Sequence, residues 1–452
     1  MKRTQKARAS KGLEGGGTIL IRGGRVVDPS TGLDKVASIL VQDGVVSEIS
    51  KEIKPADCGL RAEDILDATD KVVVPGLVDM HVHLREPGRE DEETIETGSR
   101  AALRGGFTSI CCMANTDPPI DSLGLVRFVL EKAEQANLAR VYPIGAVTKQ
   151  LKGEELAEIG DLVTGGCVAI SDDGQAIRNG EIMRRALEYA KMFNIPLISH
   201  SEDPDLTRGG QMNEGDVSTL LGLKGMPRIA EETAVARDIA LAEFTEGRLH
   251  LAHVSTRGSV QLIREAKERG VLVTCECTPH HFSLTDEAVK TFDTNAKVNP
   301  PLRAREDVEA VKEGVRDGTI DAIATDHAPH AFFEKEVEFG AAPFGMVGLE
   351  TALGLVITQL VLPGILTLSE AVATLSSNPA RILGLRAGSL KQGLPADITI
   401  IDLEKEWVVD PAEFASKSRN TPFGGWRLKG AVFATIVGGK VLFGPSENYY
   451  SE

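Results

Sequence analysis

Two histidines lie two residues apart in the stretch VDMHVHLREPG, residues 78–88. Side chains of an extended strand alternate between its two faces, so His81 and His83 are expected to point the same way. Two adjacent imidazoles pack poorly in a core but make good metal ligands. The chain has only 9 histidines in 452 residues, so this pair indicates a metal site if the rest of the chain supplies more ligands.

Further potential ligands stand at the ends of four other apolar runs. They are Asp172, Asp173, His200, His253, Asp326 and His327. Each has an alternative interpretation: Asp172-Asp173-Gly174 can form a turn, the single histidines can be core residues, and Asp326 can cap the next segment. All these alternatives would have to hold together, so the joint pattern favours a metal site.

The ligand types indicate which metal chemistry is available. Histidine and carboxylate ligands without cysteine suit zinc or another divalent transition metal. Six ligands exceed one tetrahedral site with an open position, and they suit two metals that share a carboxylate and a water. Such a pair acts as a Lewis acid and lowers the pKa of the water towards about 7.

The elements that would position these ligands are short apolar runs alternating with helical stretches. Helices are expected in EIMRRALEYAKMF and in SVQLIREAKERG, the latter closed by Gly270. Eight such units predict an α/β fold, a (β/α)₈ TIM-type barrel over residues 75–385, whose strand ends converge on one face. The eight runs are GLVDMHVH, FTSICCMA, ARVYPIGAV, CVAISDD, IPLISH, RLHLAHVS, VLVTCEC and DAIATDHAPH.

Both ends of the chain are rich in short strands. Residues 18–74 alternate in strand fashion, with breaks at Gly23-Gly24 and Asp43-Gly44, and the same texture returns in residues 386–447. We expect these two segments to form one small β-sandwich domain. Residues 1–17 are basic, polar and glycine-rich, which indicates a disordered tail, with a short targeting peptide as the alternative.

Composition excludes some classes of function. The formal net charge of −16 argues against nucleic acid and anionic membranes as partners. No apolar run approaches the roughly 20 residues of a membrane span. The six cysteines form no CxxC pair, which is typical of reduced residues in a cytoplasmic protein without a structural zinc site.

Eight motifs together carry a resemblance to a known family. In chain order they are DMHVHLREPG, MANTDPP, SDDG, SHSED, LAHVST, TPHHF, NPPLR and ATDHAPH. This set closely resembles the class I, bacterial-type dihydroorotases of the amidohydrolase superfamily, over residues 18 to 445. The resemblance implies a zinc-dependent cyclic amidohydrolase with one or two zinc ions, most simply two.

The resemblance also implies a role for each ligand. His81 and His83 would bind one metal together with Asp326, and His200 with His253 would bind the second. Asp173 would bridge the two, where many relatives use a carboxylated lysine, and Asp172 would support the site from behind. The stretch GGCVAISDDGQAI contains no lysine for that task, which separates the chain from dihydropyrimidinases and hydantoinases.

Substrate contacts follow from the same resemblance. Arg85 and Asn115 would hold a substrate carboxylate with help from His330, since a guanidinium matches a carboxylate in a bidentate fork. The alternative for Arg85 is a surface salt bridge with Glu86 or Glu90. The pyrimidine ring would be contacted by Asn299, Phe344 and Gly345.

The implied reaction is the reversible cyclisation of N-carbamoyl-L-aspartate to L-dihydroorotate in de novo pyrimidine (UMP) biosynthesis. In the hydrolytic direction a bridging hydroxide would attack the ring carbonyl, and Asp326 would shuttle the proton to the leaving nitrogen. The long stretch 327–345 is either a lid over the substrate or an ordinary loop.

The residues leave two rival functions open. The rival activities are those of another cyclic amidase, such as allantoinase or hydantoinase, and the rival of another class is an inactive scaffold. A homo-oligomer is expected, and aspartate transcarbamoylase is a candidate partner because family members can associate with it.

Overall fold

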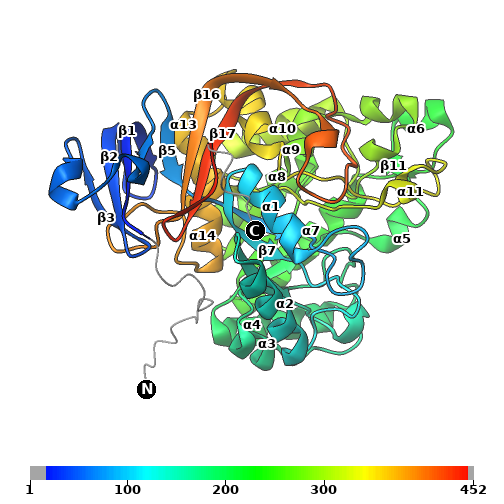
Figure 1. Ribbon diagram of the computed structural model, residues 1–452. Helices are drawn as coiled ribbons and strands as arrows, with labels where there is room; N and C mark the ends of the chain where they lie inside the picture. Colours follow the sequence, from blue (N-terminus) through cyan, green and yellow to red (C-terminus); the bar gives the residue numbers. More distant parts are fainter. Residues whose placement is uncertain (1–16, 446–452) are drawn as a thin grey trace.

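The computed structural model describes residues 17–445, and it contains a barrel beside a mixed sheet (Figure 1). The predicted tail, residues 1–17, lies outside the described residues except for Gly17. Within residues 17–445, no helix combines the length and hydropathy that a membrane crossing requires.

Eight parallel strands form the barrel in the order β15-β14-β13-β10-β9-β8-β7-β6. A parallel bridge between Val82 and His327 closes it, and the backbone N–H of His83 donates to the carbonyl of His327 at 2.9 Å. Each of the eight predicted runs contains one strand, so the predicted barrel is confirmed. The strands are β6 (Leu77–Val82), β7 (Phe107–Cys112), β8 (Arg140–Gly145), β9 (Ala169–Ser171), β10 (Leu197–Ser199), β13 (Leu249–Leu251), β14 (Val273–Cys277) and β15 (Ala322–Ile323).

Helices connect the strands and cover the outside of the barrel. The main connecting helices are α1 (Ile95–Arg104), α2 (Leu123–Ala136), α3 (Ile159–Gly165), α4 (Gly180–Phe193), α7 (Ile229–Thr245), α8 (Arg257–Glu268) and α10 (Arg305–Arg316). After β15 come α12 (Ala352–Val356), α13 (Leu368–Val372) and α14 (Asn378–Leu383). Short elements in the connections are α5 (Pro204–Thr207), β11 (Met212–Asn213), α6 (Asp216–Leu221), β12 (Gly225–Met226), α9 (Pro279–Ser283) and α11 (Phe332–Lys335).

Helix α4 shows why these helices form where the sequence predicts them. The side chain of Asn179 caps the first turn by accepting from two backbone N–H groups, and Asn194 ends the helix in the left-handed conformation. Met183, Leu187 and Ala190 recur at helical spacing and are buried against the barrel. Capping and periodicity therefore agree on the same boundaries.

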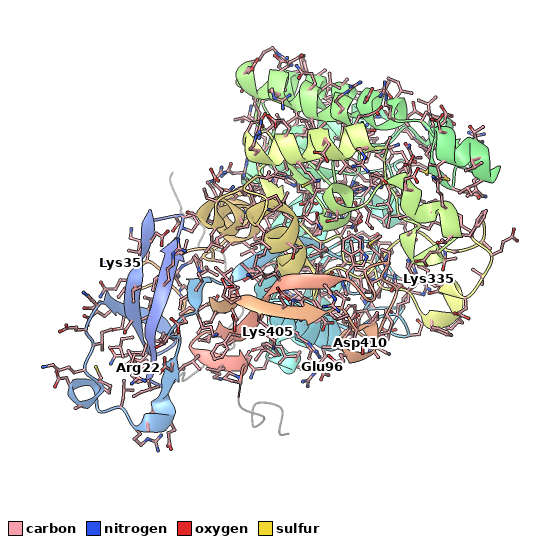
Figure 2. The ribbon with its side chains drawn as sticks, turned by 90° about the horizontal axis from the view of Figure 1, so that it is seen from above. Arg22, Lys35, Glu96, Lys335, Lys405 and Asp410 are labelled. Carbon is pink, nitrogen blue, oxygen red and sulfur yellow. The ribbon has the colours of Figure 1, made fainter. Side chains whose placement is uncertain are left out.

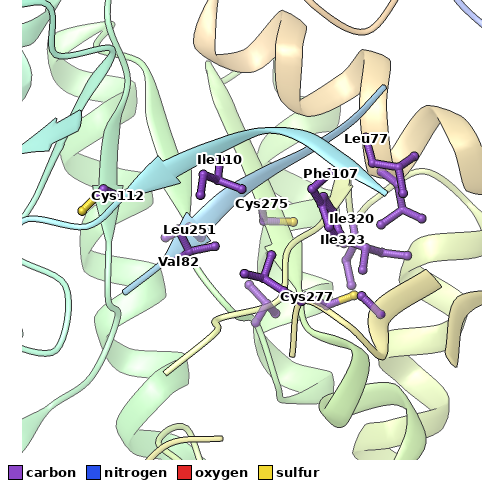
Figure 3. Close-up of a cluster of buried hydrophobic side chains, with 14 of the residues drawn as sticks. Leu77, Val82, Phe107, Ile110, Cys112, Leu251, Cys275, Cys277, Ile320 and Ile323 are labelled. Atoms are coloured by element: carbon purple, nitrogen blue, oxygen red, sulfur yellow. The ribbon is translucent and has the colours of Figure 1, made fainter. Parts of the chain in front are cut away.

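The barrel strands bury apolar side chains on both faces. Figure 3 shows Leu251, Cys275 and Cys277 in the cluster between the strands and the helices. Residues from neighbouring strands, such as Ile144 and Ala322, belong to a second buried cluster with Met80. The polar residues at the strand ends are therefore held by strands that are packed on both faces and shielded from water.

The mixed sheet takes its strands from both ends of the chain, in the order β18-β17-β16-β5-β1-β2-β3 with β4 beside β1. The barrel beside this sheet confirms the predicted fold class, while the exact domain limits stay a prediction. The sheet's strands are β1 (Ile19–Asp28), β2 (Leu33–Gln42), β3 (Val45–Ser50), β4 (Ile65–Asp67), β5 (Val72–Pro75), β16 (Ile398–Val408), β17 (Arg427–Val437) and β18 (Lys440–Phe443).

The predicted break at Gly23-Gly24 is wrong, because β1 runs through it as one strand with a register shift. Gly23 has φ 75°, and a Cβ on Gly24 would lie 2.6 Å from a methyl group of Val73. The glycines thus permit a bulge where β5 passes closely. The break at Asp43-Gly44 is the turn between β2 and β3, as predicted.

Candidate active site

The six predicted metal ligands meet at the C-terminal ends of five barrel strands. His81 lies on β6 and His83 directly follows it, and the others follow β9, β10, β13 and β15. All six are buried, with 8% exposure at most. Three residues at the site, Arg85, His253 and Asp326, have positive φ angles of 59°, 34° and 48°, a strained conformation that is common at functional sites.

Asp173 lies at the centre of the group. Its Oδ2 is 3.3 Å from Nε2 of His81 and 3.5 Å from Nε2 of His83. Its Oδ1 is 3.3 Å from Nε2 of His253 and 3.6 Å from Nδ1 of His200. Each oxygen of the Asp173 carboxylate therefore faces a different pair of histidines.

Asp326 lies beside the first pair, with Oδ1 3.0 Å from Nε2 of His83 and 3.4 Å from Nε2 of His81. Burial raises the pKa of this carboxyl, but the neighbouring histidines His81 and His83 outweigh it and hold the pKa below its usual range. The group is thus an anion in a dry setting, able to hold a cation or accept a proton.

The residues present fit a metal centre. The donor atoms of His81, His83 and Asp326 lie within 4.8 Å of one another, and so do those of His81, Asp173 and His253. Nε2 of His81 is buried and has no hydrogen-bond partner within the described residues. An unpaired buried nitrogen that faces two carboxylates is what a cation-binding group requires.

Asp172 points away from the histidines, although it is adjacent to Asp173 in sequence. Its Oδ1 accepts from the backbone N–H groups of Val147 and Thr148 at 2.8 and 3.0 Å. Its Oδ2 accepts from the Thr148 hydroxyl. The side chain therefore fixes the β8 end of the barrel, in keeping with a supporting role.

Asn115 and Arg85 lie where substrate contacts were predicted, but both have protein partners. Oδ1 of Asn115 is 2.7 Å from Nδ1 of His83. Nε of Arg85 is 3.0 Å from Oε2 of Glu92 and donates to the Pro329 carbonyl at 3.2 Å. The proposed alternative of a surface salt bridge to Glu86 or Glu90 is wrong, because Arg85 is largely buried and pairs with Glu92.

The loop after β15 carries the remaining predicted contacts. Nδ1 of His330 is 2.9 Å from Oε1 of Glu92, and its Nε2 is 2.8 Å from the Phe344 carbonyl. The N–H of Gly345 donates to the Lys297 carbonyl. Glu92 therefore contacts both Arg85 and His330, two of the residues that were predicted to bind the substrate carboxylate.

Two polar groups near the histidines have no assigned role in the sequence analysis. Glu202 of the SHSED motif lies 3.3 Å from Nε2 of His200 and accepts from Nδ2 of Asn299 at 2.7 Å. His280 of the TPHHF motif is 2% exposed with Nε2 unpaired among the described residues, and burial lowers its pKa well below the usual range. The sequence signal that could have identified both residues is a charged or titratable side chain inside a motif that carries the family resemblance.

Comparisons with known proteins show which family the chain belongs to. Residues 70–259 match the family described as "Dihydro-orotase-like", and residues 227–443 match the "Amidohydrolase family". A protein of Acetivibrio thermocellus named "Dihydroorotase" is 57% identical over 424 residues, covering 94% of this chain and 98% of that protein. One of Syntrophotalea carbinolica with the same name is 54% identical and covers 94% and 99%.

Solved structures share the fold. The L-hydantoinase (dihydropyrimidinase) of Arthrobacter aurescens is 27% identical, with a TM-score of 0.85 and coverage of 95% of this chain and 96% of that one. Dihydropyrimidinase of Brevibacillus agri is 22% identical, with a TM-score of 0.81 and coverage of 95% of each chain. Since its identity to the curated relatives is far higher, the chain belongs to the dihydroorotase family of the amidohydrolases.

Proposed function

We propose that this cyclic amidohydrolase is a zinc-dependent dihydroorotase, which interconverts N-carbamoyl-L-aspartate and L-dihydroorotate in pyrimidine biosynthesis. The observation that carries the proposal is the Asp173 carboxylate between two histidine pairs, in a chain 57% identical to a protein named dihydroorotase. The four histidines, Asp173 and Asp326 would hold one or two zinc ions. When bound, zinc would polarise a carbonyl and lower the pKa of a bound water.

Asp326 has the position required of a proton carrier. Its carboxylate borders the histidine group, 3.0 Å from His83, and it is 8% exposed at the end of β15. In hydrolysis it would accept the proton of the attacking water and deliver it to the leaving amide nitrogen. In cyclisation the same carboxylate would move the proton in the opposite direction.

Arg85, Asn115 and His330 would bind the carboxylate of the substrate. Arg85 is already anchored at Nε by Pro329 and Glu92, so its guanidinium is oriented before substrate arrives. Asn299, Phe344 and Gly345 would contact the ring. A hydantoinase activity is the second candidate, because the Arthrobacter aurescens L-hydantoinase has a TM-score of 0.85 to this chain.

Removal of the metal is the first test. Chelation should abolish turnover of N-carbamoyl-L-aspartate and dihydroorotate, followed by ultraviolet absorbance, and zinc should restore it. Hydantoin and allantoin serve as control substrates, and we expect neither to be turned over. Turnover that survives complete chelation contradicts the metal requirement, and faster turnover of hydantoin would favour the second candidate.

We further propose that residues 327–345 act as a lid, with α11 at its tip. Nζ of Lys335 donates to the carbonyls of Thr294 and Pro343 at 3.0 and 2.7 Å, and Nζ of Lys297 donates to that of Phe339 at 2.7 Å. Figure 2 places Lys335 on the barrel side of the molecule. Burial, aided by the charge of Lys297, lowers the pKa of Lys335 to about 7.

A lid of this kind should respond to ligand and to loss of its anchor. Dihydroorotate should slow proteolysis between residues 327 and 345, and Lys335→Met should speed it by removing two hydrogen bonds. Lys391→Met, an exposed lysine far along the chain, is the matched control. Cleavage rates that do not change with ligand would reduce the segment to an ordinary loop.

Assembly and location extend the proposal. The chain would act in the cytoplasm as a homo-oligomer, and aspartate transcarbamoylase is a candidate partner for an active enzyme. Membership of the dihydroorotase family supports these expectations.

A further inference from the structure

A charged side chain lies inside the barrel behind the histidine group. Glu276 is the penultimate residue of β14 and is 1% exposed, whereas its neighbours Cys275 and Cys277 belong to the apolar cluster outside the strands. The interior of such a barrel is normally filled by branched apolar side chains. A carboxylate at this depth costs several kcal/mol unless it is well paired, so its presence calls for a reason.

Both oxygens of Glu276 are bound by histidines. Oε1 lies 2.7 Å from Nδ1 of His81, and Oε2 lies 3.2 Å from Nε2 of His250. Nδ1 of His250 is in turn 2.8 Å from the hydroxyl of Thr274. The four side chains form a line from a candidate metal ligand back to β13 and β14.

The contact between Glu276 and His81 is possible because the side chains of β15 and the residue after it that face the barrel interior are small. β15 separates β14 from β6 in the closed barrel, and Glu276 pairs in register with Ala322. Ala322 and Ala324 are both buried in the cluster with Met80. Two alanines leave room for a glutamate to reach across β15 to His81, where valine or isoleucine would fill the space.

The contact is made by the nitrogen of His81 that faces away from the other ligands. Nε2 of His81 faces Asp173 and Asp326 at 3.3 and 3.4 Å, while Nδ1 faces Glu276. A histidine that binds metal usually donates its second ring N–H to a carboxylate or carbonyl. That contact fixes the tautomer, orients the ring and raises its basicity.

We propose that Glu276 is a positioning residue for metal binding through His81, and that His250 anchors Glu276 in place. This inference rests on the proposed metal centre. Glu276 lies 195 positions from His81 and 26 positions from His250 in the sequence. His83 has a neutral counterpart of this contact in Asn115, so within the first histidine pair only His81 has a carboxylate behind it.

Metal affinity measures this role directly and without turnover. Metal-free protein is titrated with zinc against a chromophoric chelator, for the wild type, Glu276→Gln and His250→Asn. Glutamine keeps the shape and can still accept from His81, but it lacks the charge. We expect Glu276→Gln to weaken zinc binding about 10- to 100-fold, and His250→Asn to weaken it less, at the position that includes His81.

Glu350→Gln is the matched control, because Glu350 is a buried carboxylate that accepts from the backbone of Ala415 and Ser416 instead of a histidine. It should bind zinc like the wild type, and thermal unfolding of the metal-free variants should show that each is folded. Wild-type zinc affinity in Glu276→Gln, or an equal loss in Glu350→Gln, overturns the inference. If Glu276→Gln does not fold, His250→Asn decides in the same way.

The outcomes also separate this inference from the proposed function. A wild-type protein that binds zinc while Glu276→Gln binds it equally well refutes the positioning role alone. A wild-type protein that binds no zinc refutes the proposed metal centre, and the positioning role with it.

Discussion

Replacing Asp326 with alanine is expected to lower kcat by about 10²- to 10⁴-fold, the usual contribution of a positioned proton carrier. The carboxylate lies 3.0 Å from Nε2 of His83 and 3.4 Å from Nε2 of His81, at the end of the last barrel strand. The other carboxylate that faces this pair, Asp173, also faces His200 and His253, so we assign Asp173 to the metal centre and Asp326 to the proton. Turnover in both directions should fall, because one group carries the proton each way.

Controls separate this loss from a loss of folding or of metal. Asp326→Asn keeps the shape of the side chain and should be nearly as inactive as the alanine variant. Asp317→Asn, at a carboxylate that is 33% exposed and paired with Arg264, should retain wild-type turnover. Circular dichroism and zinc content are measured on each variant, and wild-type-like turnover in a folded Asp326→Ala protein would refute the proton-carrier role.

The barrel was predictable because its signals are local. Each strand lies in an apolar run, and the runs that supply ligands end in polar residues, as in IPLISH, where β10 ends at Ser199 and His200 follows. Helix α4 begins beside its Asn179 cap and ends at Asn194. Capping and periodicity act within one or two turns, so they can be read from a single sequence.

The bulge at Gly23-Gly24 was not predictable in the same way. Two glycines between apolar runs indicate a turn when only neighbours in sequence are considered. In the structure, Val73 of β5 approaches Gly24 from about fifty residues away, and the glycines allow that approach within one strand. A distant contact therefore decided the local conformation.

The ligand group was predictable and its support was not. The histidines and aspartates stand at strand ends, and the barrel brings such ends together whatever their order. The partner of each ligand depends on side-chain reach across the barrel, as with Glu276 and His81, or on a loop, as with Glu92 and Arg85. Those pairings follow from packing in three dimensions and leave no fixed spacing in the chain.

The adjacent aspartates provide the sharpest test of the metal centre, because one residue is the control for the other. Asp173 faces His81, His83, His200 and His253, whereas Asp172 caps the backbone at Val147 and Thr148. Asp173→Asn should bind less zinc and lose about 10³-fold in kcat, since the Lewis-acid contribution of several kcal/mol disappears with the metal.

Asp172→Asn should behave differently, although it is the same substitution at the adjacent residue. The asparagine amide keeps one accepting oxygen but places an NH₂ donor where the other carboxylate oxygen accepted, so at least one of the three hydrogen bonds is lost and the free energy of unfolding should fall by about 1–3 kcal/mol. Zinc content should remain that of the wild type once the protein is folded. Zinc content by atomic emission and denaturant unfolding give the two readouts, and a reversed pattern would make Asp172 the bridging carboxylate.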